Sequence, residues 1–78
     1  MSHTPHELPD EFPHLAEKIS EMKQADAHFA RLADDYHALN RAVHRAEMLV
    51  EPVEELAEVE MRRQRATLKD EIYRLLTA

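Results

Sequence analysis

The chain has 78 residues, which is room for one small domain. It contains no glycine and no cysteine, and 33% of its residues are charged. The missing glycine argues against tight β-hairpin turns, and the missing cysteine excludes disulfides and thiol chemistry. Because a net charge of -6 is repelled by nucleic acid and by anionic membranes, neither is expected as a partner.

Residues 1–12 are predicted to be a flexible extension that precedes a single helical domain at residues 13–78. Pro5, Pro9 and Pro13 recur at every fourth position of this stretch. A proline inside a helix clashes with the carbonyl group four residues before it, so any helix here is limited to about one turn. We therefore expect a mobile or loosely docked tail.

A short additional helix is predicted to begin near Pro13, because proline is tolerated in a first helical turn. Its apolar residues are three or four positions apart, as in a helix-packing seam: Phe12, Leu15, Ile19 and Met22. The next seam position is Asp26. An aspartate there either lies within a continuous helix or caps a new helix that begins at Ala27. The sequence leaves both possibilities open.

The strongest helical pattern follows this point. Apolar residues again step by three or four along one face: Phe29, Leu32, Tyr36, Leu39 and Val43. Asn40 lies beside this face. A polar residue near a seam can fix the register of helix pairing, whereas a residue just outside the seam would be exposed. The sequence does not distinguish these two roles for Asn40.

A second boundary lies at Pro52, because a proline disfavours helix for the residue before it. Helix is predicted to resume at Val53, with a weaker apolar stripe made of Met61, Leu68, Ile72 and Leu75. A short loop between two long helices requires them to lie antiparallel. The predicted fold is therefore all-α: an antiparallel coiled-coil hairpin with a short additional N-terminal helix and a flexible N-terminal tail.

The packing residues also resemble a known family. The most telling segment is residues 68–72, Leu-Lys-Asp-Glu-Ile, and the pattern from Phe29 to Val43 and residues 45–47 support it. From Phe12 to Leu76 the chain is similar to the YdcH-like family of small bacterial coiled-coil proteins, whose function is unknown. The resemblance implies a helical hairpin and supplies no site residues. The extension before Phe12 departs from the shortest members, so nothing is carried over onto it.

Six histidines are the first candidates for a metal site. His37 and His44 are seven residues apart, whereas two ligands on one helix need a spacing of three or four. His3, His6 and His14 lie in or next to the predicted tail and could bind zinc or nickel only weakly. No metal site and no cofactor are therefore expected, and the histidines are predicted to be solvated.

Four basic residues of the last helix form the main alternative site: Arg62, Arg63, Arg65 and Lys69. Short basic runs can bind phosphate groups, so this face could serve a nucleic-acid accessory protein. Acidic residues surround the run, however, and no aromatic residue is interleaved for base stacking. A salt-bridged helix surface is the simpler interpretation.

No catalytic residues are predicted. The adjacent carboxylates of Asp34–Asp35 and Glu54–Glu55 point in different directions on a helix, whereas acid–base catalysis needs them together in a cleft. No serine or threonine has a base arranged nearby for nucleophilic catalysis. We therefore expect a protein that is not an enzyme.

The predicted function is a non-enzymatic protein–protein interaction module. A core of this size is marginal alone, so the chain is expected to form homo-oligomers or to bind another helical protein. The apolar residues of both long helices are the predicted interface: Phe29, Leu32, Tyr36, Leu39, Val43, Met61, Leu68, Ile72 and Leu75. Aspartate at Leu39 or Leu68 should then unfold or dissociate the protein. The longest clearly apolar run, residues 48–50, is too short to span a bilayer, and a cytoplasmic location is expected.

Overall fold

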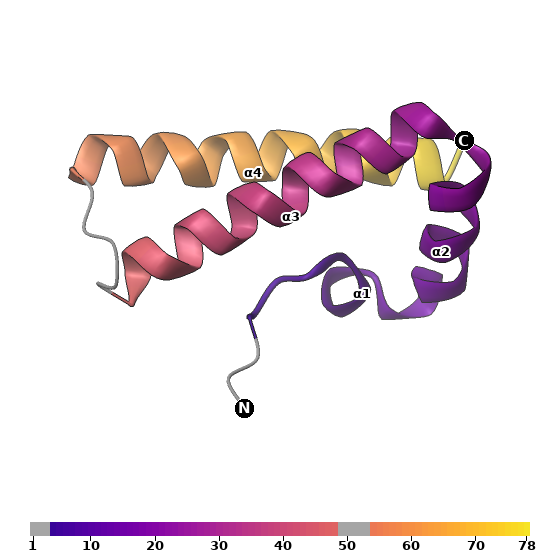
Figure 1. Ribbon diagram of the computed structural model, residues 1–78, viewed down its shortest axis with the longest axis horizontal. Helices are drawn as coiled ribbons and strands as arrows, with labels where there is room; N and C mark the ends of the chain where they lie inside the picture. The colour runs from indigo at the N-terminus through magenta and orange to yellow at the C-terminus, as the bar shows by residue number, and fades with distance from the viewer. Residues whose placement is uncertain (1–3, 49–53) are drawn as a thin grey trace.

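The computed structural model describes residues 4–48 and 54–78, and in these ranges the regular structure is entirely helical (Figure 1). The elements in chain order are α1 (Leu8–Glu11), the 3-10 helix η1 (Pro13–Leu15), α2 (Ala16–Ala25), α3 (Ala27–Glu47) and α4 (Glu55–Leu76). These elements confirm the predicted all-α fold class. The predicted boundary at Pro52 and Val53 lies outside the described residues. None of the helices in the two described ranges has the length and apolar character needed to cross a membrane.

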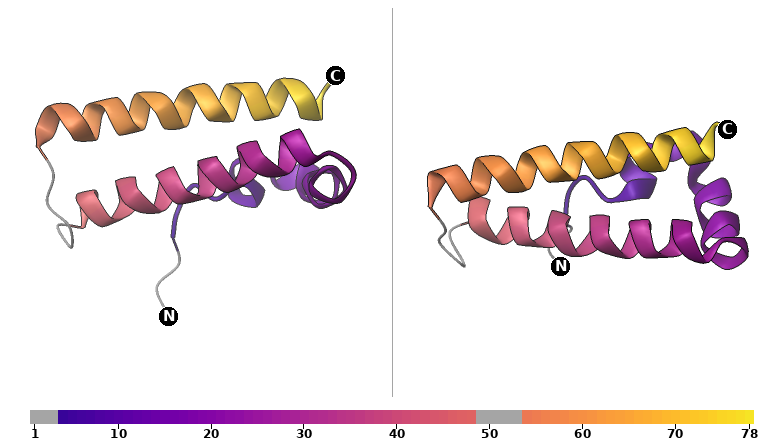
Figure 2. Two further views of the ribbon diagram at one scale, coloured as in Figure 1. Left: turned by 45° about the horizontal axis from the view of Figure 1, so that its top comes forward. Right: turned by 90° about the horizontal axis from the view of Figure 1, so that it is seen from above.

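The two long helices, α3 and α4, lie side by side and run in opposite directions (Figures 1 and 2). Helix α2 crosses the end of this hairpin where α4 ends, and the N-terminal segment returns along α3. Arg62 links the two helices near the other end. Its guanidinium lies 3.0 Å from Glu58, one turn before it, and 3.2 Å from Glu47 at the end of α3. The antiparallel hairpin expected from the sequence is the observed arrangement.

The helix is interrupted at Asp26, so α2 and α3 are two separate helices. The backbone of Asp26 is extended, with φ −135° and ψ 109°. Its Oδ1 atom accepts hydrogen bonds from the backbone N–H groups of His28 at 2.9 Å and Phe29 at 3.2 Å. Such a cap satisfies N–H groups that the first turn of a helix leaves unpaired, and it typically contributes about 1 kcal/mol. The aspartate on the seam therefore begins a helix.

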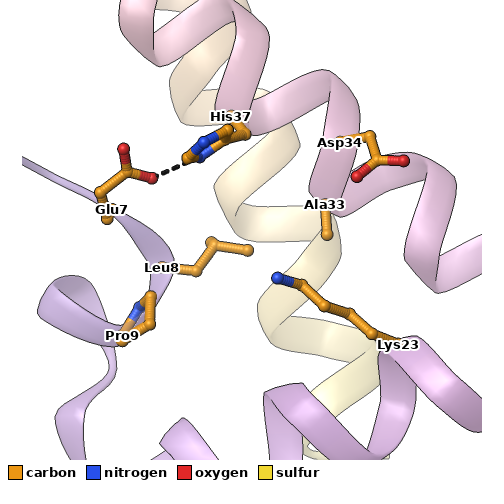
Figure 3. Close-up of a pocket in the computed structure, with 7 residues that line it drawn as sticks. All are labelled: Glu7, Leu8, Pro9, Lys23, Ala33, Asp34 and His37. Carbon is orange, nitrogen blue, oxygen red and sulfur yellow. Dashed lines mark hydrogen bonds and ion pairs between the residues drawn. The ribbon is translucent and has the colours of Figure 1, made fainter. Parts of the chain in front are cut away.

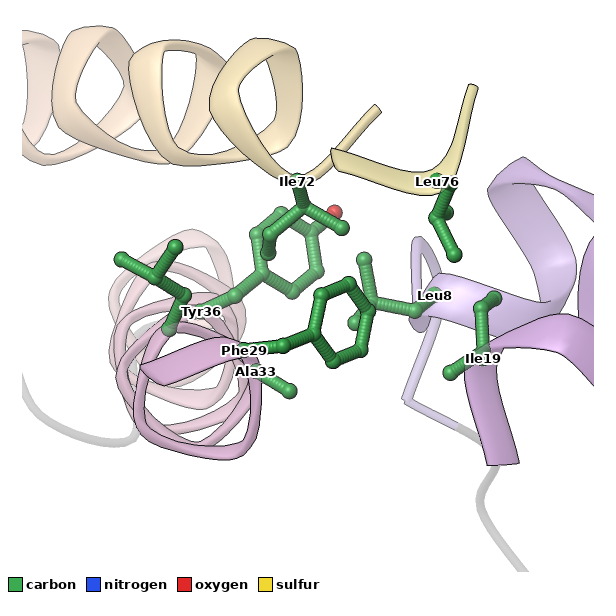
Figure 4. Close-up of a cluster of buried hydrophobic side chains, with 8 residues drawn as sticks. Leu8, Ile19, Phe29, Ala33, Tyr36, Ile72 and Leu76 are labelled. Atoms are coloured by element: carbon green, nitrogen blue, oxygen red, sulfur yellow. The ribbon is translucent and has the colours of Figure 1, made fainter. Parts of the chain in front are cut away.

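One hydrophobic core joins the hairpin to α2 and to the N-terminal segment (Figure 4). Its buried residues are Leu8, Ile19, Phe29, Leu32, Ala33, Tyr36, Ile72 and Leu76. In Figure 4 the side chains of Phe29, Tyr36 and Ile72 converge, and Leu8 approaches them from the N-terminal segment. Two helices alone cannot enclose such a core. Here α2 and the N-terminal segment cover the side that the hairpin leaves open.

The N-terminal segment, residues 4–12, which the sequence predicts to be a mobile or loosely docked extension, packs against the hairpin. Leu8 is only 4% exposed and belongs to the same core as α3 and α4. The ring of Phe12 stacks on that of Tyr73 in α4, with the centroids 5.3 Å apart. The prolines limit α1 to a single turn, as expected, but they do not prevent the segment from docking.

Candidate interaction sites

Two polar side chains of α3 hold the N-terminal segment through its backbone. Asn40 is completely buried, and its Nδ2 group donates a hydrogen bond to the carbonyl of Pro5 at 2.8 Å. The Tyr36 hydroxyl donates to the carbonyl of His6 at 2.6 Å. Arg65 of α4 donates to Asn40 Oδ1 at 2.9 Å. Asn40 thus connects three segments of the chain, and its burial excludes the exposed position that the sequence left open.

The backbone of His6 adopts a conformation that costs free energy. Its φ of 63° lies in the left-handed region, which disfavours residues other than glycine. Such a residue persists where surrounding contacts fix it. The hydrogen bond from Tyr36 to the His6 carbonyl is a contact of this kind.

Two contacts between side chains add to this docking. His37 Nδ1 lies 2.6 Å from the carboxylate of Glu7 (Figure 3), and Lys69 Nζ lies 3.0 Å from that of Glu11. The hydrogen bond from Lys69 holds the pKa of the Glu11 carboxyl below its usual value, although partial burial opposes this shift. His6, 3.5 Å from Glu11, lowers the same pKa further. Two carboxylates of the N-terminal segment therefore each face a basic group of the hairpin.

A cavity of about 420 Å³ lies between the N-terminal segment, α2 and α3 (Figure 3). Lys23 of α2 and Asp34 of α3 line it, together with the Glu7–His37 pair and Leu8. Its rim therefore carries charges of both signs, and one wall is apolar. This mixture does not select one class of ligand.

Ionisation of Tyr36 is expected to destabilise the protein at alkaline pH. Burial raises the pKa of Tyr36 from 10.0 to about 12, and the Glu11 carboxylate adds to the rise. Because the folded state holds this proton more tightly than the unfolded state, stability is complete below pH 10 and falls as the pH rises from 10 to 12. The free energy of unfolding should fall by about 2 to 3 kcal/mol over this range. Urea denaturation at a series of pH values measures the loss.

Two conservative variants separate this effect from other alkaline titrations. Tyr36→Phe should lose about 1 kcal/mol at neutral pH, because the hydrogen bond to His6 is removed, and it should lack the alkaline loss described above. Tyr73→Phe removes an exposed hydroxyl and leaves Tyr36 in place, so the alkaline loss should remain. Equal alkaline losses in the two variants would contradict the role assigned to Tyr36.

The four basic residues predicted as an alternative site all have partners within the protein. Arg62 pairs with Glu47 and Glu58, Arg63 with Glu60, Arg65 with Asn40 and Lys69 with Glu11. Two of these contacts, those of Arg65 and Lys69, belong to the docking of the N-terminal segment. The run is therefore a salt-bridged helix surface rather than a patch of unpaired positive charge.

The histidines of the described ranges do not gather into a metal site. Within residues 4–48 and 54–78, no group of three or more histidine, aspartate or glutamate residues could hold an ion. His37 and His6 lie near carboxylates of the N-terminal segment. His3 lies outside the described residues. Sequence reasoning missed the pairing of His37 with Glu7, since the two residues are 30 positions apart.

The nine residues predicted as an interface fall into two groups. Five of them are buried within the chain: Phe29, Leu32, Tyr36, Val43 and Ile72. The other four are partly exposed: Leu39, Met61, Leu68 and Leu75. The first group packs inside the folded chain. The second group keeps some exposed surface, and two of its members, Leu68 and Leu75, also pack against the core.

Leu39 and Leu68 line a groove of about 370 Å³ on the surface between α3 and α4. The remaining lining residues all come from α4: Glu60, Arg63, Gln64 and Thr67. The walls are mostly apolar. No described residue of the N-terminal segment lines this groove. The groove is therefore separate from the surface that the N-terminal segment covers.

Large apolar side chains are exposed at the end of the hairpin where α3 ends and α4 begins. Leu56, in the first turn of α4, is 82% exposed, and Val59 and Met48 are also exposed. Sequence reasoning missed Leu56 as a candidate site residue. The signal was present, because Leu56 lies five residues before Met61 and so does not fit the helical spacing of the packing stripe. A large apolar residue off that stripe must face another direction.

Comparison with known proteins identifies a family but no activity. Residues 29–76 match the family model described as "Protein of unknown function (DUF465)". The match begins in the first turn of α3 and ends at the last residue of α4, so it coincides with the hairpin. Neither the curated proteins nor the solved structures gave a match. Because the matched segment spans more than half of the chain, the protein belongs to this family of proteins of unknown function.

Proposed function

We propose that the protein is a non-enzymatic interaction module whose helical hairpin associates with a second copy of itself. The observation that carries this proposal is the apolar groove beside Leu39 and Leu68, together with the exposed side chain of Leu56 on the same hairpin. Exposed apolar surface of this kind is typical of protein–protein contact sites. Association would remove it from water, which is the main driving force for most protein complexes.

The remainder of the hairpin supports this choice of surface. The face that carries Phe29, Tyr36 and Ile72 is already covered by α2 and the N-terminal segment. The basic residues of α4 have partners within the chain, which favours a protein partner over the nucleic acid considered as the alternative. A different helical protein would use the same groove. The YdcH-like assignment, the bacterial source and the cytoplasmic location stay predictions from the sequence.

The mass in solution tests this proposal. Light scattering after size exclusion is expected to show monomers of 9.1 kDa at low concentration and dimers at higher concentration. The dimer should persist at high salt, because salt screens charge contacts rather than apolar ones. Leu56→Lys places a charge on the proposed contact surface and should keep the protein monomeric over the same concentration range.

Ser20→Lys is the matched control, because it adds the same charge at an exposed position of α2, away from the groove. It should dimerise like the parent protein. A parent protein that stays monomeric at every concentration would refute self-association. If Leu56→Lys dimerised as well as the parent, association would use another surface. Binding to nucleic acid that weakens steeply with salt would instead favour the basic face.

A further inference from the structure

Leu56 and the groove lie on the same face of α4. The groove residues of this helix follow helical spacing: Glu60, Arg63, Gln64, Thr67 and Leu68. Leu56 lies four residues before Glu60 and so continues this face towards the start of the helix. A projecting leucine and an apolar hollow therefore share one surface. Leu56 and Thr67 are about 16 Å apart along the helix axis.

We infer that Leu56 of one copy fills the groove of a second copy, with the two α4 helices packed antiparallel about a two-fold axis. This inference rests on the self-association proposed above. Leu56 does not line the groove of its own chain, whose nearest α4 residue, Glu60, lies one turn further along the same helix. A two-fold axis fills both grooves at once, since each copy presents the same surface to the other. The dimer is then closed, with neither Leu56 left to recruit a further copy.

Charges at the edge of the groove favour this register. With Leu56 opposite Thr67 of the partner subunit, Glu60 lies opposite the partner's Arg63. The two-fold axis repeats this contact, so two pairs of opposite charge meet across the interface. Glu60 and Arg63 are both well exposed and lie 3.8 Å apart within one chain. Each can therefore add a contact to the partner without the burial of an unpaired charge.

A parallel arrangement of the same faces lacks this complementarity. Parallel helices in register would place Glu60 against the partner's Glu60 and Arg63 against the partner's Arg63. Like charges placed together are destabilising. The two Leu56 side chains would meet each other, and the groove beside Leu39 and Leu68 would stay unfilled. The antiparallel arrangement satisfies both the apolar and the charged groups.

Cysteine substitutions test this register, because the chain contains no cysteine of its own. In the double variant Leu56→Cys/Thr67→Cys, the two positions face each other across the proposed interface. Mild oxidation is expected to move the band on a non-reducing gel from 9.1 kDa to twice that mass. A bond within one chain is excluded by geometry, since the positions are about 16 Å apart and a disulfide requires Cα atoms within about 7 Å.

The two single variants are the controls. In the antiparallel pair, position 56 lies about 16 Å along the helix axis from position 56 of the other copy, and the same holds for position 67. Neither Leu56→Cys nor Thr67→Cys should therefore cross-link alone. An equimolar mixture of the two should give the dimer band that neither gives by itself.

A charge exchange provides a second measurement that leaves Leu56 in place. Glu60→Arg puts two like-charged pairs into the interface and should shift dimerisation to higher concentration. The double variant Glu60→Arg/Arg63→Glu restores opposite charges across the two-fold axis and should restore dimerisation. Light scattering over a concentration series measures both shifts.

Several results would overturn the inference. A dimer band from Leu56→Cys alone would mean that the two copies of position 56 meet, as in a parallel pair. A dimeric double-cysteine variant without a dimer band would mean that the copies associate through another surface, so that self-association would stand without this register. Failure of the charge exchange to restore dimerisation would have the same meaning. A parent protein that never dimerises would remove both proposals.

Discussion

Replacing Ile72 with aspartate is expected to leave the protein unfolded at room temperature. Ile72 is fully buried and belongs to the core with Phe29 and Tyr36. Loss of a buried aliphatic side chain costs about 2 to 5 kcal/mol, and a carboxylate without a partner in this apolar site adds to the cost. A core of this size supplies only about 3 to 5 kcal/mol in total. Circular dichroism should therefore show the loss of most of the helical signal.

Leu39→Asp is the matched comparison, because Leu39 belongs to the predicted seam but lines the surface groove in the structure. Its carboxylate can reach water, so the helical signal should stay close to that of the parent protein. The dimer should be lost, because the partner's Leu56 would meet a charge. The sequence predicts that this variant unfolds or dissociates, and the position of Leu39 favours dissociation. Unfolding as complete as that of Ile72→Asp would place Leu39 in the core instead.

Helical spacing, together with the boundary at Pro52, was sufficient to predict the hairpin. The residues of the predicted stripe recur every three or four positions from Phe29 to Val43, and all of them except Leu39 are buried on one side of α3. Asp26 carried a local signal as well, because its side chain caps N–H groups only two and three residues later. Features that depend on near neighbours in the sequence can be predicted from periodicity and capping.

The docking of the N-terminal segment does not leave such a pattern in the sequence. Asn40 and Tyr36 bind the carbonyl groups of Pro5 and His6, and every residue has a carbonyl group. The partners are 30 and 35 residues apart in the sequence, so helical spacing does not relate them. Leu8 is a single apolar residue beside a proline, and one residue has no periodicity.

The position of the groove cannot be predicted from the spacing of the apolar residues. Leu39 and Leu68 match the helical spacing as well as the buried residues do. Whether they face the core or its edge depends on how α3 and α4 cross, and spacing within one helix does not fix that crossing. The predicted interface therefore combined core residues with residues of the surface groove.

Docking of the N-terminal segment depends on Leu8, so Leu8→Ala is expected to release it. Leu8 is 4% exposed, and truncation of a buried leucine costs about 2 to 5 kcal/mol. Each kcal/mol lowers the melting temperature of a domain of this size by about 4 to 8 °C, so a fall of at least about 8 °C is expected. Hydrogen exchange should quicken at the amides of Glu11 and Phe12, which donate to the carbonyls of Glu7 and Leu8.

Leu56→Ala makes the same chemical change at an exposed leucine and is the matched control. Measured where the protein is monomeric, it should change the free energy of unfolding by less than about 0.5 kcal/mol. If Leu8→Ala also melted at the parent's temperature, Leu8 would not be anchored, and residues 4–12 would be the flexible extension that the sequence predicts. A lower melting temperature with faster exchange at Glu11 and Phe12 would make the segment part of the folded domain. The face of the hairpin that carries Phe29, Tyr36 and Ile72 would then be closed to partners, which leaves the groove beside Leu39 for contact with a second copy.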